Sequence, residues 1–104
     1  MPSHITLLYF DSCPSYIEAL ANLQAVLAER NHPTEVQLIQ VETHDMAQTV
    51  QFVGSPTIRI NGEDIFPTSN TTYALGCRVY NTPIGLRGVP TTEMIREAIA
   101  NFGL

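Results

Sequence analysis

The stretch Gly54-Ser55-Pro56-Thr57 leads into the alternating run Ile58-Arg59-Ile60, the dipeptide Asn61-Gly62 and then Asp64-Ile65-Phe66. Asn-Gly supplies the positive φ angles that a tight primed turn requires, and apolar residues alternate on both sides of it. The stretch therefore predicts two antiparallel strands joined by a hairpin, with a proline immediately before the first strand.

Cys13 stands at a second informative place, between the apolar run Ile5–Phe10 and a helical pattern that continues to about Arg30. Asp11 or Ser12 is the expected cap of this helix, and residues 31–33 are expected to end it. A strand that delivers a cysteine onto a helix N-terminus places its sulfur beside unpaired N–H groups and the positive end of the helix dipole. Both the N–H groups and the dipole stabilise negative charge on the sulfur. We therefore expect Cys13 to be a nucleophilic thiolate rather than an inert thiol.

The remaining elements follow from apolar periodicity. Residues 36–41 read as a second strand, which a right-handed crossover through the first helix places parallel to residues 5–10. A short helix containing Met46 follows, for which Thr43 or Asp45 is the expected cap and Gly54 the expected left-handed end. A last helix begins after Pro90, with Thr91 or Thr92 as its expected cap. The predicted order is β-α-β-α-β-β-α, an α/β domain with a four-stranded mixed sheet and an irregular loop at about 67–90.

Composition restricts the class of protein. The chain has 104 residues, enough for one domain spanning residues 1–104, and its net charge is −5 with five scattered arginines. Without a basic run, neither nucleic acid nor an anionic membrane is an expected partner. We expect no signal peptide or membrane span, and two cysteines favour a reducing cytoplasm over a secreted disulfide scaffold. His4, His32 and His44 lack metal-ligand spacing, so no metal or other cofactor is expected.

The element order, the cysteine at the first strand–helix junction and Ser55-Pro56-Thr57 before the third strand together resemble the thioredoxin-like superfamily, in its minimal glutaredoxin-type form. The likeness covers nearly the whole chain except the loop at 67–90. It implies a cis peptide between Ser55 and Pro56 beside the active-site thiol, and a wall there that receives a peptide or glutathione. The segment from Cys77 to Pro90 is similar to that of small bacterial thioredoxin-like proteins.

One departure from that family concerns its second cysteine. The family motif is C-x-x-C, whereas this chain has Cys13-Pro14-Ser15-Tyr16. A resolving thiol must therefore come from elsewhere, either from Cys77 in the irregular loop or from an external thiol such as glutathione. The alternative is that Cys77 is a small buried apolar residue. A bridge requires Cα atoms within about 7 Å of each other.

Two further residues are candidates for substrate binding. Tyr16 either donates its hydroxyl to a thiolate at Cys13 or packs in the stripe that it forms with Leu20. Arg78, like Arg59, either binds a carboxylate of glutathione or of a peptide terminus or is solvated and salt-bridged.

We therefore expect a thiol-dependent redox protein, a possible thiol–disulfide oxidoreductase. Its predicted catalytic residues are Cys13 as nucleophile and Cys77 as resolving partner, and its predicted substrate-binding residues are Ser55, Pro56, Tyr16 and Arg78. The expected partner is a protein disulfide or a small thiol such as glutathione, and the oligomeric state stays open. Two alternatives remain: a non-catalytic binding module, and a soft-metal or metalloid site formed by both thiolates.

Overall fold

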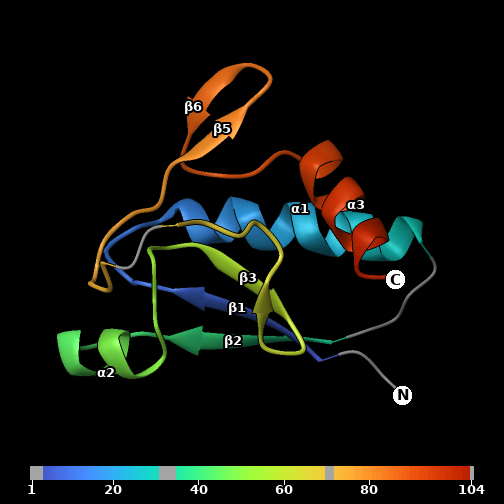
Figure 1. The fold of residues 1–104 in the computed structure, drawn as a ribbon. Helices are drawn as coiled ribbons and strands as arrows, with labels where there is room; N and C mark the ends of the chain where they lie inside the picture. Colours follow the sequence, from blue (N-terminus) through green and yellow to red (C-terminus); the bar gives the residue numbers. More distant parts are fainter. Residues whose placement is uncertain (1–3, 31–34, 70–71, 104) are drawn as a thin grey trace.

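A four-stranded mixed sheet forms the centre of the protein (Figure 1), as seen in a computed structural model that describes residues 4–30, 35–69 and 72–103. The strand order is β2-β1-β3-β4. β1 (Ile5–Tyr9) pairs in parallel with β2 (Val36–Gln40) and antiparallel with β3 (Thr57–Ile60). β4 (Glu63–Asp64) completes the sheet antiparallel to β3. The prediction of a mixed α/β domain with a four-stranded sheet is confirmed.

Helices cover both faces of this sheet. α1 (Ser15–Glu29) and α3 (Thr92–Asn101) pack on one face, and the short α2 (His44–Thr49) lies on the other (Figure 1). Because successive strand residues point to opposite faces, Ile5 and Leu7 of β1 join the larger cluster and Leu8 joins the smaller one. β1 is thus buried on both sides, which explains its continuous apolar sequence.

Several sequence signals for the ends of elements are confirmed. Thr43 and Thr91 cap α2 and α3, each accepting a hydrogen bond from the backbone N–H three residues later. Asn61 and Gly62 both have positive φ, as the predicted tight turn requires.

Other predicted boundaries are wrong. Gly54 does not end α2, because that helix stops at Thr49 and Gln51 takes the left-handed conformation instead. Pro14 is the N-cap of α1, and no side chain caps that helix. The fourth strand ends at Asp64, where the Asp64 carboxylate accepts a hydrogen bond from the Phe66 N–H and turns the chain. The predicted stop of the first helix at 31–33 lies outside the described residues.

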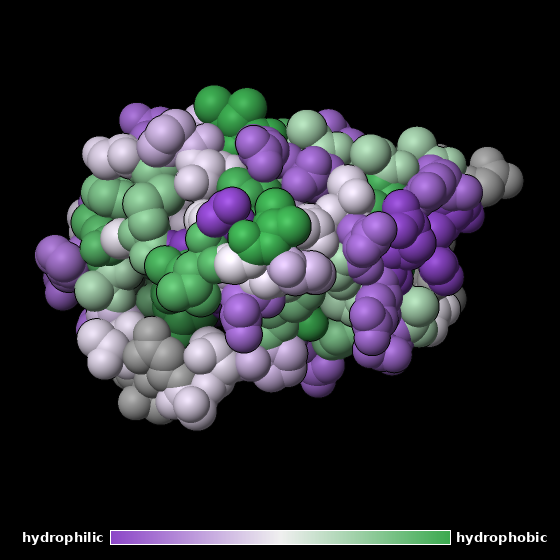
Figure 2. Space-filling model, turned by 90° about the horizontal axis from the view of Figure 1, so that it is seen from above, coloured by the Kyte–Doolittle hydropathy of each residue, from purple (hydrophilic) through white to green (hydrophobic). Residues whose placement is uncertain are grey.

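The loop predicted at 67–90 contains an element that its irregular sequence concealed. β5 (Tyr80–Thr82) and β6 (Gly85–Arg87) form a two-stranded hairpin that projects away from the helices (Figure 1). Ile84 and Leu86 on this hairpin are about two-thirds exposed, at 69% and 67%. Seen from the side toward which the hairpin projects, hydrophobic side chains gather near the middle of the surface and hydrophilic ones at its right (Figure 2). Ile84 and Leu86 lie outside both core clusters, whereas Tyr80 at the base of the hairpin is buried.

Candidate functional site

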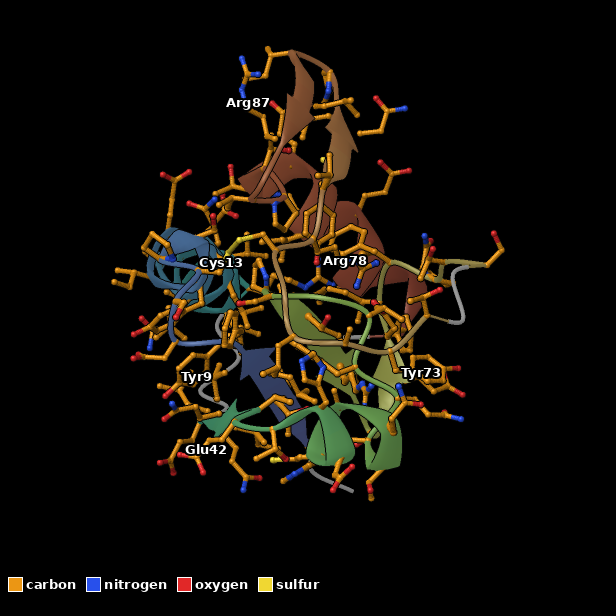
Figure 3. All side chains as sticks on the ribbon, turned by 90° about the vertical axis from the view of Figure 1, so that its left-hand side faces the viewer. Tyr9, Cys13, Glu42, Tyr73, Arg78 and Arg87 are labelled. Atoms are coloured by element: carbon orange, nitrogen blue, oxygen red, sulfur yellow. A yellow bond between two sulfur atoms is a disulfide. The ribbon has the colours of Figure 1, made fainter. Side chains whose placement is uncertain are left out.

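A disulfide bond joins the two cysteines of the chain, Cys13 and Cys77. The two residues are 64 positions apart in sequence, and their Cα atoms lie 5.7 Å apart, within the range that a disulfide spans. Figure 3 shows this bond beside the start of α1, at the base of the projecting hairpin that carries Arg87. The candidate resolving cysteine is therefore next to the candidate nucleophile.

Cys13 is held by the turn between β1 and α1. Its backbone N–H donates a 2.9 Å hydrogen bond to the carbonyl of Phe10, and Pro14 immediately after it is the N-cap of α1. Since no side chain caps this helix, its first turn offers N–H groups and the positive end of a 15-residue dipole to the cysteine. Cys13 is nevertheless only 1% exposed. The helix dipole favours negative charge at this position, whereas the burial of Cys13 disfavours it.

The peptide bond between Ser55 and Pro56 is cis, as the family resemblance implies. Ser55 is fully buried, and its carbonyl oxygen lies 3.6 Å from Cys13 Sγ. At that distance a reduced Cys13 thiol can donate a hydrogen bond to this oxygen. The proline-flanked wall predicted from sequence thus lies beside Cys13.

The main chain of Ser55 is occupied by the protein's own loop. Ser55 N–H donates to the carbonyl of Gly76, and Arg78 N–H donates to the carbonyl of Ser55, each at 2.8 Å. These two bonds form a parallel bridge between Ser55 and Cys77. An external peptide can pair with this edge only after residues 76–78 leave it. In this oxidised form the predicted substrate-binding edge holds Cys77 instead.

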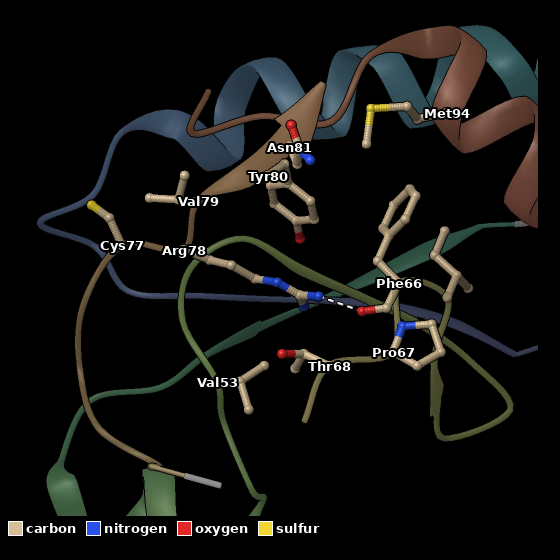
Figure 4. A pocket seen from close by; sticks show the side chains of 11 residues that line it. Val53, Phe66, Pro67, Thr68, Cys77, Arg78, Val79, Tyr80, Asn81 and Met94 are labelled. Atoms are coloured by element: carbon tan, nitrogen blue, oxygen red, sulfur yellow. Dashed lines mark hydrogen bonds between the residues drawn. The ribbon is translucent and has the colours of Figure 1, made fainter. Parts of the chain in front are cut away.

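Arg78 is the main anchor of that segment (Figure 4). Its side chain is 9% exposed, and its Nη1 lies 2.7 Å from Oδ2 of Asp64, a carboxylate that is 19% exposed. Its Nη2 donates to the carbonyl of Phe66, and its guanidinium carbon lies 4.7 Å from the centre of the Tyr80 ring. These contacts engage both terminal nitrogens of the guanidinium within the protein. They favour a structural role for Arg78 over the predicted binding of a substrate carboxylate.

Tyr80 fixes the start of the hairpin to the cis peptide. Its hydroxyl donates a hydrogen bond to the carbonyl of Pro56, and its ring packs edge-on against Phe66. Burial raises the pKa of Tyr80 well above that of an ordinary tyrosine; the charge of Arg78 acts against this shift and that of Asp64 adds to it. The phenol therefore stays protonated and keeps donating across the physiological range.

Gly54 allows the close approach of the two segments. Its φ is +124°, and a Cβ built on it would lie 2.9 Å from Cβ of Arg78 and 3.1 Å from the Arg78 backbone. No larger residue fits there without displacing the loop that carries Cys77.

Tyr16 and Arg59 are the other two candidates. Among the described residues, no contact links either side chain to the disulfide. Tyr16 stacks on Tyr9, with ring centres 4.2 Å apart, and both rings pack against the larger core cluster. Arg59 donates to the carbonyls of Val50 and Gln51, where it satisfies the end of α2. These contacts favour the packing interpretation for Tyr16 and a structural role for Arg59.

A cavity of about 590 Å³ opens next to the disulfide. Cys77, Arg78 and Tyr80 contribute one wall, and Phe66 and Met94 contribute apolar surface to the rest (Figure 4). Cys77, which is exposed, lies at the edge of this cavity.

No local pattern in the sequence marks Asp64, Tyr80 or Gly54 as part of the site. Asp64 was assigned to a strand and Gly54 to a helix end, because each also fits a local pattern. A buried arginine needs a carboxylate partner, which is the signal that would have led to Asp64. Which of the ten acidic residues meets Arg78 depends on the fold.

No family model, no curated protein and no solved structure gives a significant match to this chain. None of the helices in the described ranges is long and apolar enough to cross a membrane. Within those same ranges, no three His, Cys, Asp or Glu side chains come together as a metal site.

Proposed function

We propose that this chain is a thioredoxin-like thiol–disulfide exchange protein in which Cys13 and Cys77 alternate between two thiols and a disulfide. The observation that carries the proposal is the disulfide itself, formed by residues 64 positions apart at the start of α1 and beside the cis peptide of Ser55 and Pro56. The parallel pair β1–β2, the antiparallel β3 and β4, and the cysteine at the β1–α1 junction support the thioredoxin-like assignment.

The exchange runs in two balanced steps. In the reduced protein, one cysteine thiolate attacks a substrate disulfide R–S–S–R′; a mixed disulfide with R–S forms, and R′–S⁻ leaves with the electron pair. The second cysteine thiolate then attacks the protein sulfur of the mixed disulfide. The bond between Cys13 and Cys77 forms, and R–S⁻ leaves. The substrate is reduced by two electrons and the protein is oxidised by two.

Contacts that do not involve sulfur support the second step. The backbone bridge between Ser55 and Cys77, the ion pair of Arg78 with Asp64 and the hydrogen bond from Tyr80 to Pro56 all hold the Cys77 segment. These contacts keep the two thiols adjacent after reduction, so resolution is intramolecular and proceeds at a high effective concentration. Tyr16 occupies the position of the second cysteine of a C-x-x-C motif. A two-cysteine mechanism is still possible, because Cys77 supplies the second thiol.

The proposal includes the partner and the location. The substrate is a protein disulfide or a low-molecular-weight disulfide such as that of glutathione. The location is the cytoplasm, because a reducing pool there returns the pair to its dithiol form.

Catalysed reduction of a protein disulfide tests the proposal. With dithiothreitol as electron donor, the native protein should accelerate the reduction of insulin, and the Cys13→Ser and Cys77→Ser variants should each lose this acceleration. The Tyr16→Phe variant should retain it, since that side chain packs against Tyr9. An unaccelerated reaction with the native protein would contradict the proposal.

The burial of Cys13 favours a second candidate, a non-catalytic binding module with a structural disulfide. A cysteine residue that is 1% exposed is typical of an inert, structural disulfide. This candidate predicts that the native protein keeps its disulfide under millimolar glutathione and does not accelerate insulin reduction. The same assay therefore separates the two candidates.

A further inference from the structure

The two cysteines of the disulfide differ in their exposure to solvent. Cys13 is 1% exposed, whereas Cys77 is exposed and forms part of the wall of the 590 Å³ cavity. Thiol–disulfide exchange requires an incoming sulfur to reach one sulfur of the bond, and which one it reaches depends on access. The asymmetry of burial therefore selects the cysteine that an external thiol reaches first.

From this asymmetry we infer that Cys77 is the residue that forms the mixed disulfide with the external partner, and that Cys13 is the buried resolving thiol. This inference rests on the proposed exchange function. It reverses the roles predicted from the sequence, where the position of Cys13 at a helix start suggested the attacking residue.

The surroundings of Cys13 suit a leaving and resolving group. When an external thiolate R–S⁻ attacks Cys77 Sγ, the bond between the two cysteines breaks and Cys13 leaves as a thiolate with the electron pair, while R–S–Sγ forms on Cys77. The uncapped start of α1 stabilises that negative charge. A stabilised thiolate also leaves faster. In the reverse direction the same Cys13 thiolate attacks Cys77 Sγ and expels R–S⁻.

Access to the far side of Cys13 is restricted by the fold. The Ser55 carbonyl oxygen lies 3.6 Å from Cys13 Sγ, and Ser55 is itself fully buried. An external thiol could reach Cys13 only if the segment of Cys77 moved away, and the ion pair of Arg78 with Asp64 opposes that movement. Cys77 needs no such movement.

Mapping of the first mixed disulfide on the native protein tests the inference. The oxidised protein is treated with limiting reduced glutathione, quenched with acid at early times, alkylated and digested. We expect glutathione on the peptide of Cys77 and the alkyl group on that of Cys13. Glutathione predominantly on Cys13 would overturn the inference. This mapping requires only that a thiol opens the bond, so it gives an answer even if insulin reduction fails.

Single-cysteine variants give an independent measurement. In the folded state, the Cys77 thiol of Cys13→Ser should react with oxidised glutathione at least about ten-fold faster than the Cys13 thiol of Cys77→Ser, because only the former is exposed. In concentrated urea the two rates should converge, which controls for differences in local sequence. Equal rates in the folded state, or a faster Cys13, would contradict the assignment.

Discussion

Arg78 and Asp64 form an ion pair of 2.7 Å in which both side chains are largely withdrawn from solvent. The pair joins the segment that carries Cys77 to the end of β4, and it does so without involving the sulfurs. The position of Cys77 therefore has a support that survives reduction of the disulfide.

Loss of the acidic partner should strongly destabilise the protein. Asp64→Ala leaves the buried Arg78 charge without compensation, and breaking such a pair costs about 3 kcal/mol of the free energy of unfolding. Urea unfolding of the oxidised protein measures this. The matched control is Glu29→Ala, which removes the exposed pair with Arg96 and should cost less than about 1 kcal/mol. Equal losses in the two variants would show that Arg78 is not effectively buried.

Reduction of the disulfide should also lower stability. The bond closes a loop of 64 residues, and in the chain-entropy treatment a loop of that length contributes about 4 kcal/mol. Urea unfolding with and without dithiothreitol measures the difference. A double variant, Cys13→Ala with Cys77→Ala, should show no response to dithiothreitol. A native protein equally stable in both conditions would contradict this expectation.

Gly54 should not tolerate a side chain. Gly54→Ala forces alanine into a φ of +124° and places its Cβ against Arg78, so we expect a loss of about 1–3 kcal/mol and slower re-formation of the disulfide after reduction. The control is Gly76→Ala, beside Cys77, where φ is ordinary and a Cβ meets nothing within 4 Å. If both variants lose the same free energy of unfolding, the close packing of Gly54 on Arg78 does not contribute to stability.

Tyr80 should make stability depend on alkaline pH. Burial raises its pKa in the folded state, so below the ordinary tyrosine value of about 10 both states are protonated and its contribution is complete. Above that pH the unfolded chain loses the proton while the folded chain keeps it. The free energy of unfolding then falls, by up to about 1.4 kcal/mol per pH unit.

The Tyr80→Phe variant isolates this effect. At pH 7 it should be less stable than the native protein by about 1 kcal/mol, because the hydrogen bond to Pro56 is lost. Above about pH 10 the difference should shrink, since phenylalanine does not titrate. Urea midpoints from pH 8 to pH 11 provide the measurement, and parallel curves for the two proteins would count against a buried phenol.

The side chain of Ser55 should be dispensable although its main chain is not. Its hydroxyl is buried and has no hydrogen-bond partner among the described residues. Ser55→Ala should therefore leave stability unchanged or raise it by about 1 kcal/mol, with exchange activity retained. Thr57→Val is the contrasting variant. It removes a hydroxyl that donates to Gly54 and accepts from Arg78, and should be destabilising by at least about 1 kcal/mol. A marked loss with Ser55→Ala would point to a role for the hydroxyl.

Local patterns were sufficient to predict the framework of the fold. The apolar run of β1, the Asn61-Gly62 turn and the caps Thr43 and Thr91 are each determined by neighbours in sequence, and all are confirmed. The hairpin of β5 and β6 was missed, because its strands have three residues each and most of its side chains face solvent.

The sequence thus predicted that Cys13 lies at the junction of β1 and α1, and it indicated Cys77 as the candidate partner. It did not predict where Cys77 lies. Only the tertiary structure brings the two residues together, since contacts between segments 64 positions apart leave no local periodicity. It also decides which of the two cysteines is exposed to solvent. Burial depends on what packs over a residue, and the loop that covers Cys13 is held by Asp64, Pro56 and Ser55, three residues whose partners no short stretch of sequence reveals.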